Sequence, residues 1–320
     1  MFGRSRRIVI CELLALAAAG GAGVSAQNNV PAKPRTGILL LAHGGSKEWN
    51  GNVQAIATEV DKDEPTEVAL GMADRTTLQA GVDKLTARGV QEIVAVPLFV
   101  SSHSSVIEAT RFLLGLRPDA PPELADFTMS MDHGAMPGHC DCGGANTANA
   151  ADEKLKSTPV KNSVPIVMAP ALDRHRILAE ILADRAAAIS RHPEKEMVIL
   201  VAHGPTDDKE NSLWLADLNA VGKLINEKGK YARIEVATVR DDAEEPVREQ
   251  ATQQFRALVS AADEQGLRAL IVPVLLSYGG IENGIRKRLD GLDHVMSSSG
   301  LLPDPRVAEW VKVSGSTAQR

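Results

Sequence analysis

Aromatic side chains are scarce in this sequence of 320 residues, because Phe, Tyr and Trp together make up only 3%. Stacking platforms for bases or sugars are therefore sparse. The formal net charge is −6, and an acidic chain binds polyanions poorly, so we expect no nucleic-acid partner. Cysteine is rarer still, with three residues, which excludes a small scaffold held together by disulfides.

The beginning of the sequence has the pattern of a secretory signal peptide. Basic residues at 4–7 precede an apolar stretch that is too short for a membrane span, and small residues up to Ala26 form a cleavage pattern. We expect residues 1–26 to be removed, residues 27–35 to be a linker, and the mature protein to be exported to the periplasm without a stable membrane span. An uncleaved anchor is the alternative interpretation.

Short apolar runs alternate with helical patterns along the rest of the chain. Residues 37–42 form a continuous apolar run, which is typical of a parallel strand covered on both faces. Further strands are expected at 67–72, 92–100, 164–169, 197–202, 233–239 and 267–276, and helices at 52–60, 77–88, 106–116, 174–191, 213–227 and 246–265. This alternation predicts an α/β fold with parallel strands and helices on both faces.

Three segments of the first half return in the second half. They are Ile38–Gly44 with Val198–Gly204, Val94–Ser101 with Leu270–Ser277, and Arg176–Glu180 with Pro305–Glu309. We therefore expect two tandem flavodoxin-like or chelatase-like lobes, at residues 36–193 and 194–314, each with its own parallel sheet, followed by a tail at 315–320.

The first lobe carries an insertion at about residues 127–162 that the second lobe lacks. Its low-complexity composition predicts a mobile loop. Its His, Met and Cys side chains are ligand types that bind soft or borderline ions such as Cu(I), Co²⁺ or Ni²⁺. They form a candidate accessory metal site: His133, Met136, His139, Cys140 and Cys142. An adventitious tract without function is the alternative.

Two histidines follow strands of the first lobe. His43 comes directly after the run at 37–42, and His103 follows the run at 92–100. Ligands of open parallel sheets bind outside the carboxyl ends of the strands, so we expect both imidazoles at the same edge, sharing one divalent metal ion. Two ligands leave coordination positions open, as transfer of the ion requires. Exposed or structural histidines are the alternative.

These features resemble the sirohydrochlorin cobaltochelatase/ferrochelatase family in its small, cobalt-type class. The resemblance rests on His43-Gly44 after the first strand, on Val96-Pro-Leu-Phe99 before Ser-Ser-His103, and on the duplicated lobe. It covers the mature chain apart from the insertion. It implies a class II chelatase fold and a lyase of siroheme or cobalamin biosynthesis, which inserts Co²⁺ or Fe²⁺ into a dianionic tetrapyrrole such as sirohydrochlorin without ATP.

The resemblance also implies roles for individual residues. His43 would be metal ligand and proton acceptor, and His103 the second ligand. The macrocycle would lie against Leu98, Phe99, Val100, Ser101 and Ser102. The metal ion and the tetrapyrrole are then the partners, the ion is a substrate, and no prosthetic group is expected.

Glu108 is the second candidate catalytic residue. It lies early on the helix that follows His103, where a carboxylate can accept the protons that metal insertion releases. A solvated residue favoured by the helix dipole is the alternative. Nearby Ser101, Ser102 and Ser104 are expected either to cap this helix or to hold substrate carboxylates at its N-terminus.

The sequence departs from the family pattern in two places. In the small family the second histidine comes further along, where this chain has Ser105, and the turn from Phe99 to His103 is closer to that of protoporphyrin ferrochelatases. The metal and the macrocycle therefore stay open. The second lobe keeps His203 but has no histidine at 277–281. We expect it to close the cleft, with His203 as a vestige or a third ligand.

Export favours a rival hypothesis, because siroheme and cobalamin assembly is expected in the cytoplasm. The rival is a non-catalytic exported carrier or metallochaperone that binds metal or tetrapyrrole. A solute-binding protein of a transporter also fits two lobes, but no motif distinguishes it.

Overall fold

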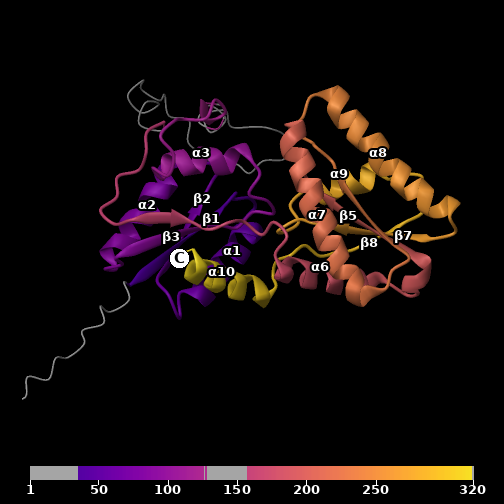
Figure 1. The fold of residues 1–320 in the computed structure, drawn as a ribbon, viewed down its shortest axis with the longest axis horizontal. Coiled ribbons are helices and arrows are strands. Elements are labelled where there is room, and N and C mark those ends of the chain that lie inside the picture. Colours follow the sequence, from indigo (N-terminus) through magenta and orange to yellow (C-terminus); the bar gives the residue numbers. More distant parts are fainter. Residues whose placement is uncertain (1–34, 126, 128–156, 319–320) are drawn as a thin grey trace, which may run out of the picture. The chain divides into compact units, whose positions relative to one another are not determined.

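Two parallel four-stranded sheets form the framework of the computed structural model, which describes residues 35–125, 127 and 157–318 (Figure 1). The strands are β1 (Thr36–Ala42), β2 (Thr66–Leu70), β3 (Glu92–Pro97), β4 (Ile166–Met168), β5 (Glu196–Ala202), β6 (Arg233–Thr238), β7 (Arg268–Pro273) and β8 (Val295–Met296). The strand orders are β2-β1-β3-β4 and β6-β5-β7-β8. The predicted α/β architecture of two tandem lobes is confirmed.

Helices cover both faces of each sheet. They are α1 (Lys47–Val60), α2 (Arg75–Ala87), α3 (Ser105–Leu113), α6 (Arg176–Ile189), α7 (Asp208–Gly229), α8 (Glu245–Glu264), α9 (Ile281–Arg288) and α10 (Pro305–Thr317). The sequence predicted the first six of these helices along the chain with shifted ends, but it did not predict α9, α10 or β8.

The internal repeat extends to the register of the strands. Leu41 of β1 pairs with Pro97 of β3, and Val201 of β5 pairs with Pro273 of β7. These are the positions that the repeated sequence segments align with one another. Each lobe therefore places the residue after its first strand at an equivalent point of the sheet edge.

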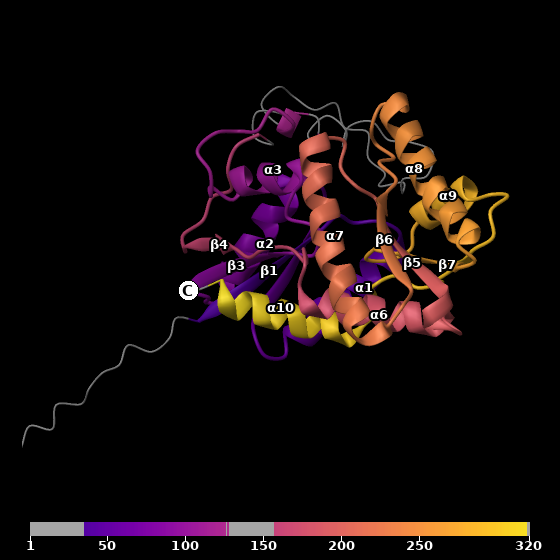
Figure 2. The same cartoon turned by 45° about the vertical axis from the view of Figure 1, so that its right-hand side comes forward.

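The last helix of each lobe packs on the sheet of the other lobe. The α6 helix follows β4 but packs against α7 and β7, whereas α10 follows β8 but packs against α1, β1 and β3 (Figures 1 and 2). Gly315 of α10 lies so close to β1 that a Cβ atom there would sit 2.7 Å from Ile38 Cδ1. The predicted lobe boundaries, 36–193 and 194–314, assign α6 to the first lobe and α10 to the second. In the structure, each of these two helices packs on the sheet of the other lobe. Residues 315–317, predicted as tail, are the end of α10.

One hydrophobic cluster joins the inner faces of both sheets. It contains Ile38 of β1, Leu200 of β5 and Trp310 of α10, each at most 1% exposed. Two further clusters lie on the outer faces, under α2 and α3 in the first lobe and under α8 and α9 in the second. Because burial of one large apolar side chain contributes about 1.5–3 kcal/mol, the shared cluster stabilises both lobes together. The described residues of both lobes accordingly fall into one compact unit.

The C-terminal end of the predicted insertion is held against the first lobe. The Val160 side chain is buried, and its N–H donates to Leu113 O at 2.7 Å. Arg75 Nε donates to Thr158 O at 2.9 Å. The structure therefore corrects the prediction of a mobile loop for residues 157–162. Several predicted features lie outside the described residues: the signal peptide at 1–26, and His133, Met136, His139, Cys140 and Cys142.

The N-terminus of α10 is fixed by a buried carboxylate. Asp304 accepts from Arg306 N at 3.1 Å, Nε at 2.9 Å and Nη2 at 2.8 Å, and Arg185 Nη2 of α6 lies 3.5 Å away. The side chain of Asp304 is only 7% exposed. Although burial opposes the charged form, the hydrogen bonds and positive charge of Arg306 and the charge of Arg185 hold the pKa of Asp304 below its ordinary value.

An Asp304→Asn variant is expected to lose about 2–3 kcal/mol of unfolding free energy at neutral pH, because two arginines lose their charged partner. Since the folded-state pKa is lowered, this stabilisation is present above the ordinary value of about 3.9 and is lost as the pH falls through the folded-state value. Urea unfolding at several pH values checks both points. Asp184→Asn is the matched control, because Asp184 contacts Arg306 at 2.7 Å but is 61% exposed. Equal losses in the two variants would contradict the argument.

Candidate metal-binding edge of the first sheet

His43 lies exposed at the carboxyl end of β1. Its Nδ1 is 2.7 Å from Gly44 O, so an Nδ1–H that donates to this carbonyl leaves the Nε2 lone pair available for a ligand. Gly44 has φ +86°, which L side chains rarely adopt, so glycine permits the turn. Asn50 accepts from Gly45 N at 2.9 Å and donates to Gly45 O at 3.1 Å. The loop that presents His43 is therefore held by α1.

The turn that carries His103 is fixed by serine hydroxyls and by Asp173. His103 N donates to Ser101 Oγ at 3.1 Å. Ser102 donates to both carboxylate oxygens of Asp173, from N at 2.5 Å and from Oγ at 2.7 Å, and its Oγ accepts from Ala171 N at 2.8 Å. Residues after β3 and β4 thus form one hydrogen-bonded unit. Ser104 caps α3, accepting from Val106 N at 3.3 Å, as one of the two predicted serine roles requires.

An Asp173→Ala variant is expected to lose about 1–3 kcal/mol of unfolding free energy, because it leaves the Ser102 donors unpaired. Asp173 also has φ +44°, a conformation that Asp and Asn tolerate better than Ala. Asp173→Asn keeps one acceptor and this tolerance, so its loss should be clearly smaller. Urea unfolding curves compare the two variants. Equal losses would show that the carboxylate contacts do not hold the turn.

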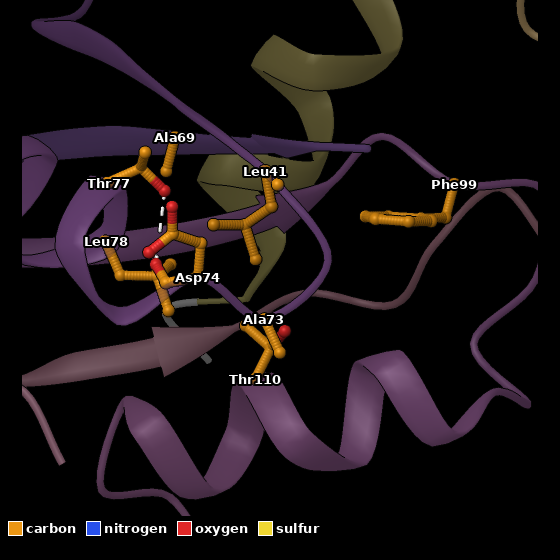
Figure 3. A pocket seen from close by; sticks show the side chains of 9 residues that line it. Leu41, Ala69, Ala73, Asp74, Thr77, Leu78, Phe99 and Thr110 are labelled. Atoms are coloured by element: carbon orange, nitrogen blue, oxygen red, sulfur yellow. Dashed lines mark hydrogen bonds between the residues drawn. The ribbon is translucent and has the colours of Figure 1, made fainter. Parts of the chain in front are cut away.

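The structure corrects the predicted macrocycle wall at two positions. Leu98 is fully buried in the central cluster, and Ser101 is only 3% exposed with its hydroxyl used by His103. Phe99 is half-buried and points toward a cavity of about 10 Å³ beside Leu41 and Thr110 (Figure 3). That volume suits about one water molecule and not a macrocycle. The apolar run of β3 continues inward at these positions, so only the half-buried part of the predicted wall can meet a ligand.

Glu108 lies in the first turn of α3, as predicted, and is paired with arginines. Its Oε2 is 2.7 Å from Arg117 Nη1, and its Oε1 is 3.6 Å from Arg111 Nε. The carboxylate is 46% exposed, so these pairs are screened by water. Both oxygens face positive side chains, and the role of Glu108 as a base stays a prediction.

A face of α7 from the second lobe covers His103. Trp214 Nε1 donates to His103 O at 2.6 Å, and Asp217 Oδ2 lies 3.5 Å from His103 Nε2. Glu210, Trp214 and Asp217 follow one another at helical spacing and therefore share one side of the helix. None of these three residues was predicted from the sequence. Their spacing in the sequence indicates only that they share one face of a helix, and it does not indicate which residues that face contacts.

Carboxylates dominate the surroundings of His103. Burial raises the pKa of Asp217, and the negative charge of Asp173 adds to this, against the positive influence of His103 and Arg174. Burial also raises the pKa of Glu210, with neighbouring carboxylates as a further cause. Carboxyl groups of both lobes therefore lie close to His103.

The second lobe repeats this edge without the second histidine. His203 follows β5, and its Nε2 lies 3.6 Å from Asp242 Oδ2, a carboxylate that is 75% exposed. Residues 277–281 follow β7 and contain no histidine, and Ser277 Oγ accepts from Asn52 Nδ2 of the first lobe at 3.4 Å. This part of the second lobe thus contacts the first lobe and presents no imidazole.

Two general findings concern ions and membranes. Within the described residues, no group of three or more His, Cys, Asp or Glu side chains is arranged to hold a metal ion. Across the same part of the chain, every helix is too short or too polar to span a bilayer.

The sequence was also compared with known families and structures. Residues 37–189 match the CbiX family model. The match comprises the first lobe with His43, His103 and α6. The predicted resemblance to the sirohydrochlorin chelatases is thereby confirmed. A search of curated proteins found no match.

Solved structures show the same fold. SirB from Bacillus subtilis with Fe³⁺ has a TM-score of 0.58 and 15% identity, over 89% of this chain and 95% of SirB. A cobalt complex of the chelatase SirB from Bacillus subtilis subspecies spizizenii has a TM-score of 0.53 and 14% identity, over 89% and 96%. DR2241 from Deinococcus radiodurans, a multi-domain protein, has a TM-score of 0.51 and 16% identity, over 90% of this chain but 56% of DR2241.

Proposed function

We propose that this protein inserts a divalent metal ion, Co²⁺ or Fe²⁺, into a tetrapyrrole of the sirohydrochlorin type without ATP. The observation that carries the proposal is the placement of His43 and His103 after the neighbouring strands β1 and β3 of the lobe that matches CbiX. The similar SirB structures contain Fe³⁺ and cobalt, which supports ions of this class.

The chemistry needs a ligand that releases the ion and a group that accepts protons. His43 presents an Nε2 lone pair outside the sheet when its Nδ1–H donates to Gly44 O. The same lone pair suits both roles in sequence, because a neutral imidazole binds a divalent ion and can accept a proton once the ion has passed to the pyrrole nitrogens. His103 is the second ligand of the proposal. Few protein ligands leave positions at which the pyrrole nitrogens take over the ion.

Export to the periplasm is part of the proposal, and it rests on the signal-peptide pattern of residues 1–26. A carrier that binds the metal or the tetrapyrrole without insertion is the rival function. The absence of a histidine at 277–281 favours this rival, because the second lobe has lost one of the two imidazoles.

An absorbance time course with sirohydrochlorin and Co²⁺ or Fe²⁺ tests the proposal. The protein should accelerate the spectral change of metal insertion well above the protein-free rate, with many turnovers per protein. ATP should have no effect on the rate. If the protein binds metal or macrocycle stoichiometrically and does not accelerate insertion, the proposal is wrong and the carrier function replaces it.

A further inference from the structure

A carboxylate of the second lobe faces the predicted second metal ligand of the first lobe. Asp217 Oδ2 lies 3.5 Å from His103 Nε2. This oxygen is buried and accepts no hydrogen bond, although the side chain as a whole is 16% exposed. A buried carboxylate oxygen loses its hydration, which disfavours the charged form unless a positive partner lies close by.

The distance between the two atoms fits two ligands of one ion. Imidazole nitrogen and carboxylate oxygen bind a metal such as zinc at about 2.0–2.2 Å. At a tetrahedral angle, two such bonds place the donor atoms about 3.4 Å apart. A charge-assisted hydrogen bond between the same atoms would be shorter, at about 2.7–2.9 Å. The observed separation is longer than such a hydrogen bond and is compatible with two ligands of one ion.

The α7 helix contacts both the backbone and the ring of His103. Trp214 Nε1 donates to His103 O and so fixes the backbone of the histidine, while Asp217, one turn further along the same face, meets its ring. Ser101 accepts from His103 N on the other side. Ligand and carboxylate are thus positioned by the contact between the lobes.

The second lobe contains a matched pair that lacks the burial. His203 Nε2 lies 3.6 Å from Asp242 Oδ2, but the Asp242 side chain is 75% exposed and is solvated by water. Both residues of this pair also belong to the same lobe. The two His–Asp distances are nearly the same but the exposures differ, so Asp242 is the control for Asp217.

We propose that Asp217 is a ligand of the divalent metal substrate and holds the ion together with His103 across the two lobes. This inference rests on the proposed function, in which the ion is cargo that must leave. Closure of the site depends on α7, so the second lobe contributes to metal binding although it lacks the second histidine.

Titration of the full-length protein with Co²⁺ alone, without tetrapyrrole, tests the inference through the visible absorption of bound cobalt. All proteins carry Cys11→Ser, Cys140→Ser and Cys142→Ser together with His133→Ala and His139→Ala, so that the cysteines and the predicted accessory site do not contribute. Asp217→Asn is expected to weaken Co²⁺ binding at least about tenfold. Asp242→Asn should leave the affinity within about twofold, because an exposed pair contributes little. Unchanged Co²⁺ binding in folded Asp217→Asn would overturn the inference.

If Asp217→Asn fails to fold, a second variant tests the inference instead. Asp217→Cys presents a thiolate at the same position, so Co²⁺ should produce a near-ultraviolet charge-transfer band that the parent protein lacks. Absence of this band while Co²⁺ still binds would overturn the inference.

The insertion assay separates this inference from the proposed function. If the parent protein inserts metal and Asp217→Asn binds Co²⁺ normally, the function stands and Asp217 is no ligand. If Asp217→Asn has lost Co²⁺ binding but the parent protein does not insert metal, Asp217 is a ligand of a carrier.

Discussion

A His103→Ala variant should lose metal insertion by at least about 100-fold in kcat/KM, equivalent to about 2.7 kcal/mol of transition-state stabilisation. His103 contributes the only imidazole of its turn, and that turn is fixed by Ser101 and by Trp214 of the second lobe. The turn itself therefore supplies no second imidazole to replace it. His43→Ala should lose at least as much, because the proposal gives His43 both ligand and proton-acceptor roles.

The chain offers a matched control for these variants. His203 occupies the same position after β5 that His43 occupies after β1, and it is partly exposed beside Asp242. His203→Ala should therefore keep the rate of insertion within about twofold, since surface substitutions away from the site have small effects. Steady-state rates from the absorbance assay compare the three variants. If His203→Ala loses as much as His103→Ala, the assignment of the site to the first lobe is wrong.

The fold was predictable because the local signals agree with one another. Buried parallel strands appear as continuous apolar runs, and the repeated segments fix which strands are equivalent. The register of β1 with β3 and of β5 with β7 follows that repeat. The exchange of α6 and α10 was not predictable, because local periodicity shows which face of a helix is apolar but not which sheet covers it.

The sequence predicts candidate site residues only where it marks the end of a strand. His43 and His103 follow β1 and β3, so topology alone places them at one edge. Asp173 and Asp217 lie far from them in the sequence, and their contacts with the His103 turn arise from tertiary packing. Leu98 was misassigned to the macrocycle wall for the opposite reason. An apolar residue at the end of a strand suits the core as well as a ligand surface, and only the structure decides between them.

A Trp310→Ala variant should lose about 3–5 kcal/mol of unfolding free energy, which is a large part of the roughly 5–15 kcal/mol typical of a folded protein. Trp310 is 1% exposed and belongs to the cluster between the two sheets. It lies on α10, which continues from the second lobe but packs on the first. The cavity that the variant creates therefore weakens both lobes.

The control for this variant lies on the same helix. Val313 is 50% exposed, so Val313→Ala should change the unfolding free energy by less than about 0.5 kcal/mol. Unfolding in urea, followed by circular dichroism, measures both variants. Because the central cluster takes side chains from both sheets, Trp310→Ala should shift a single transition and not split it in two. A variant in which one lobe melts early while the other keeps its original midpoint would show that the exchanged helix does not couple the lobes.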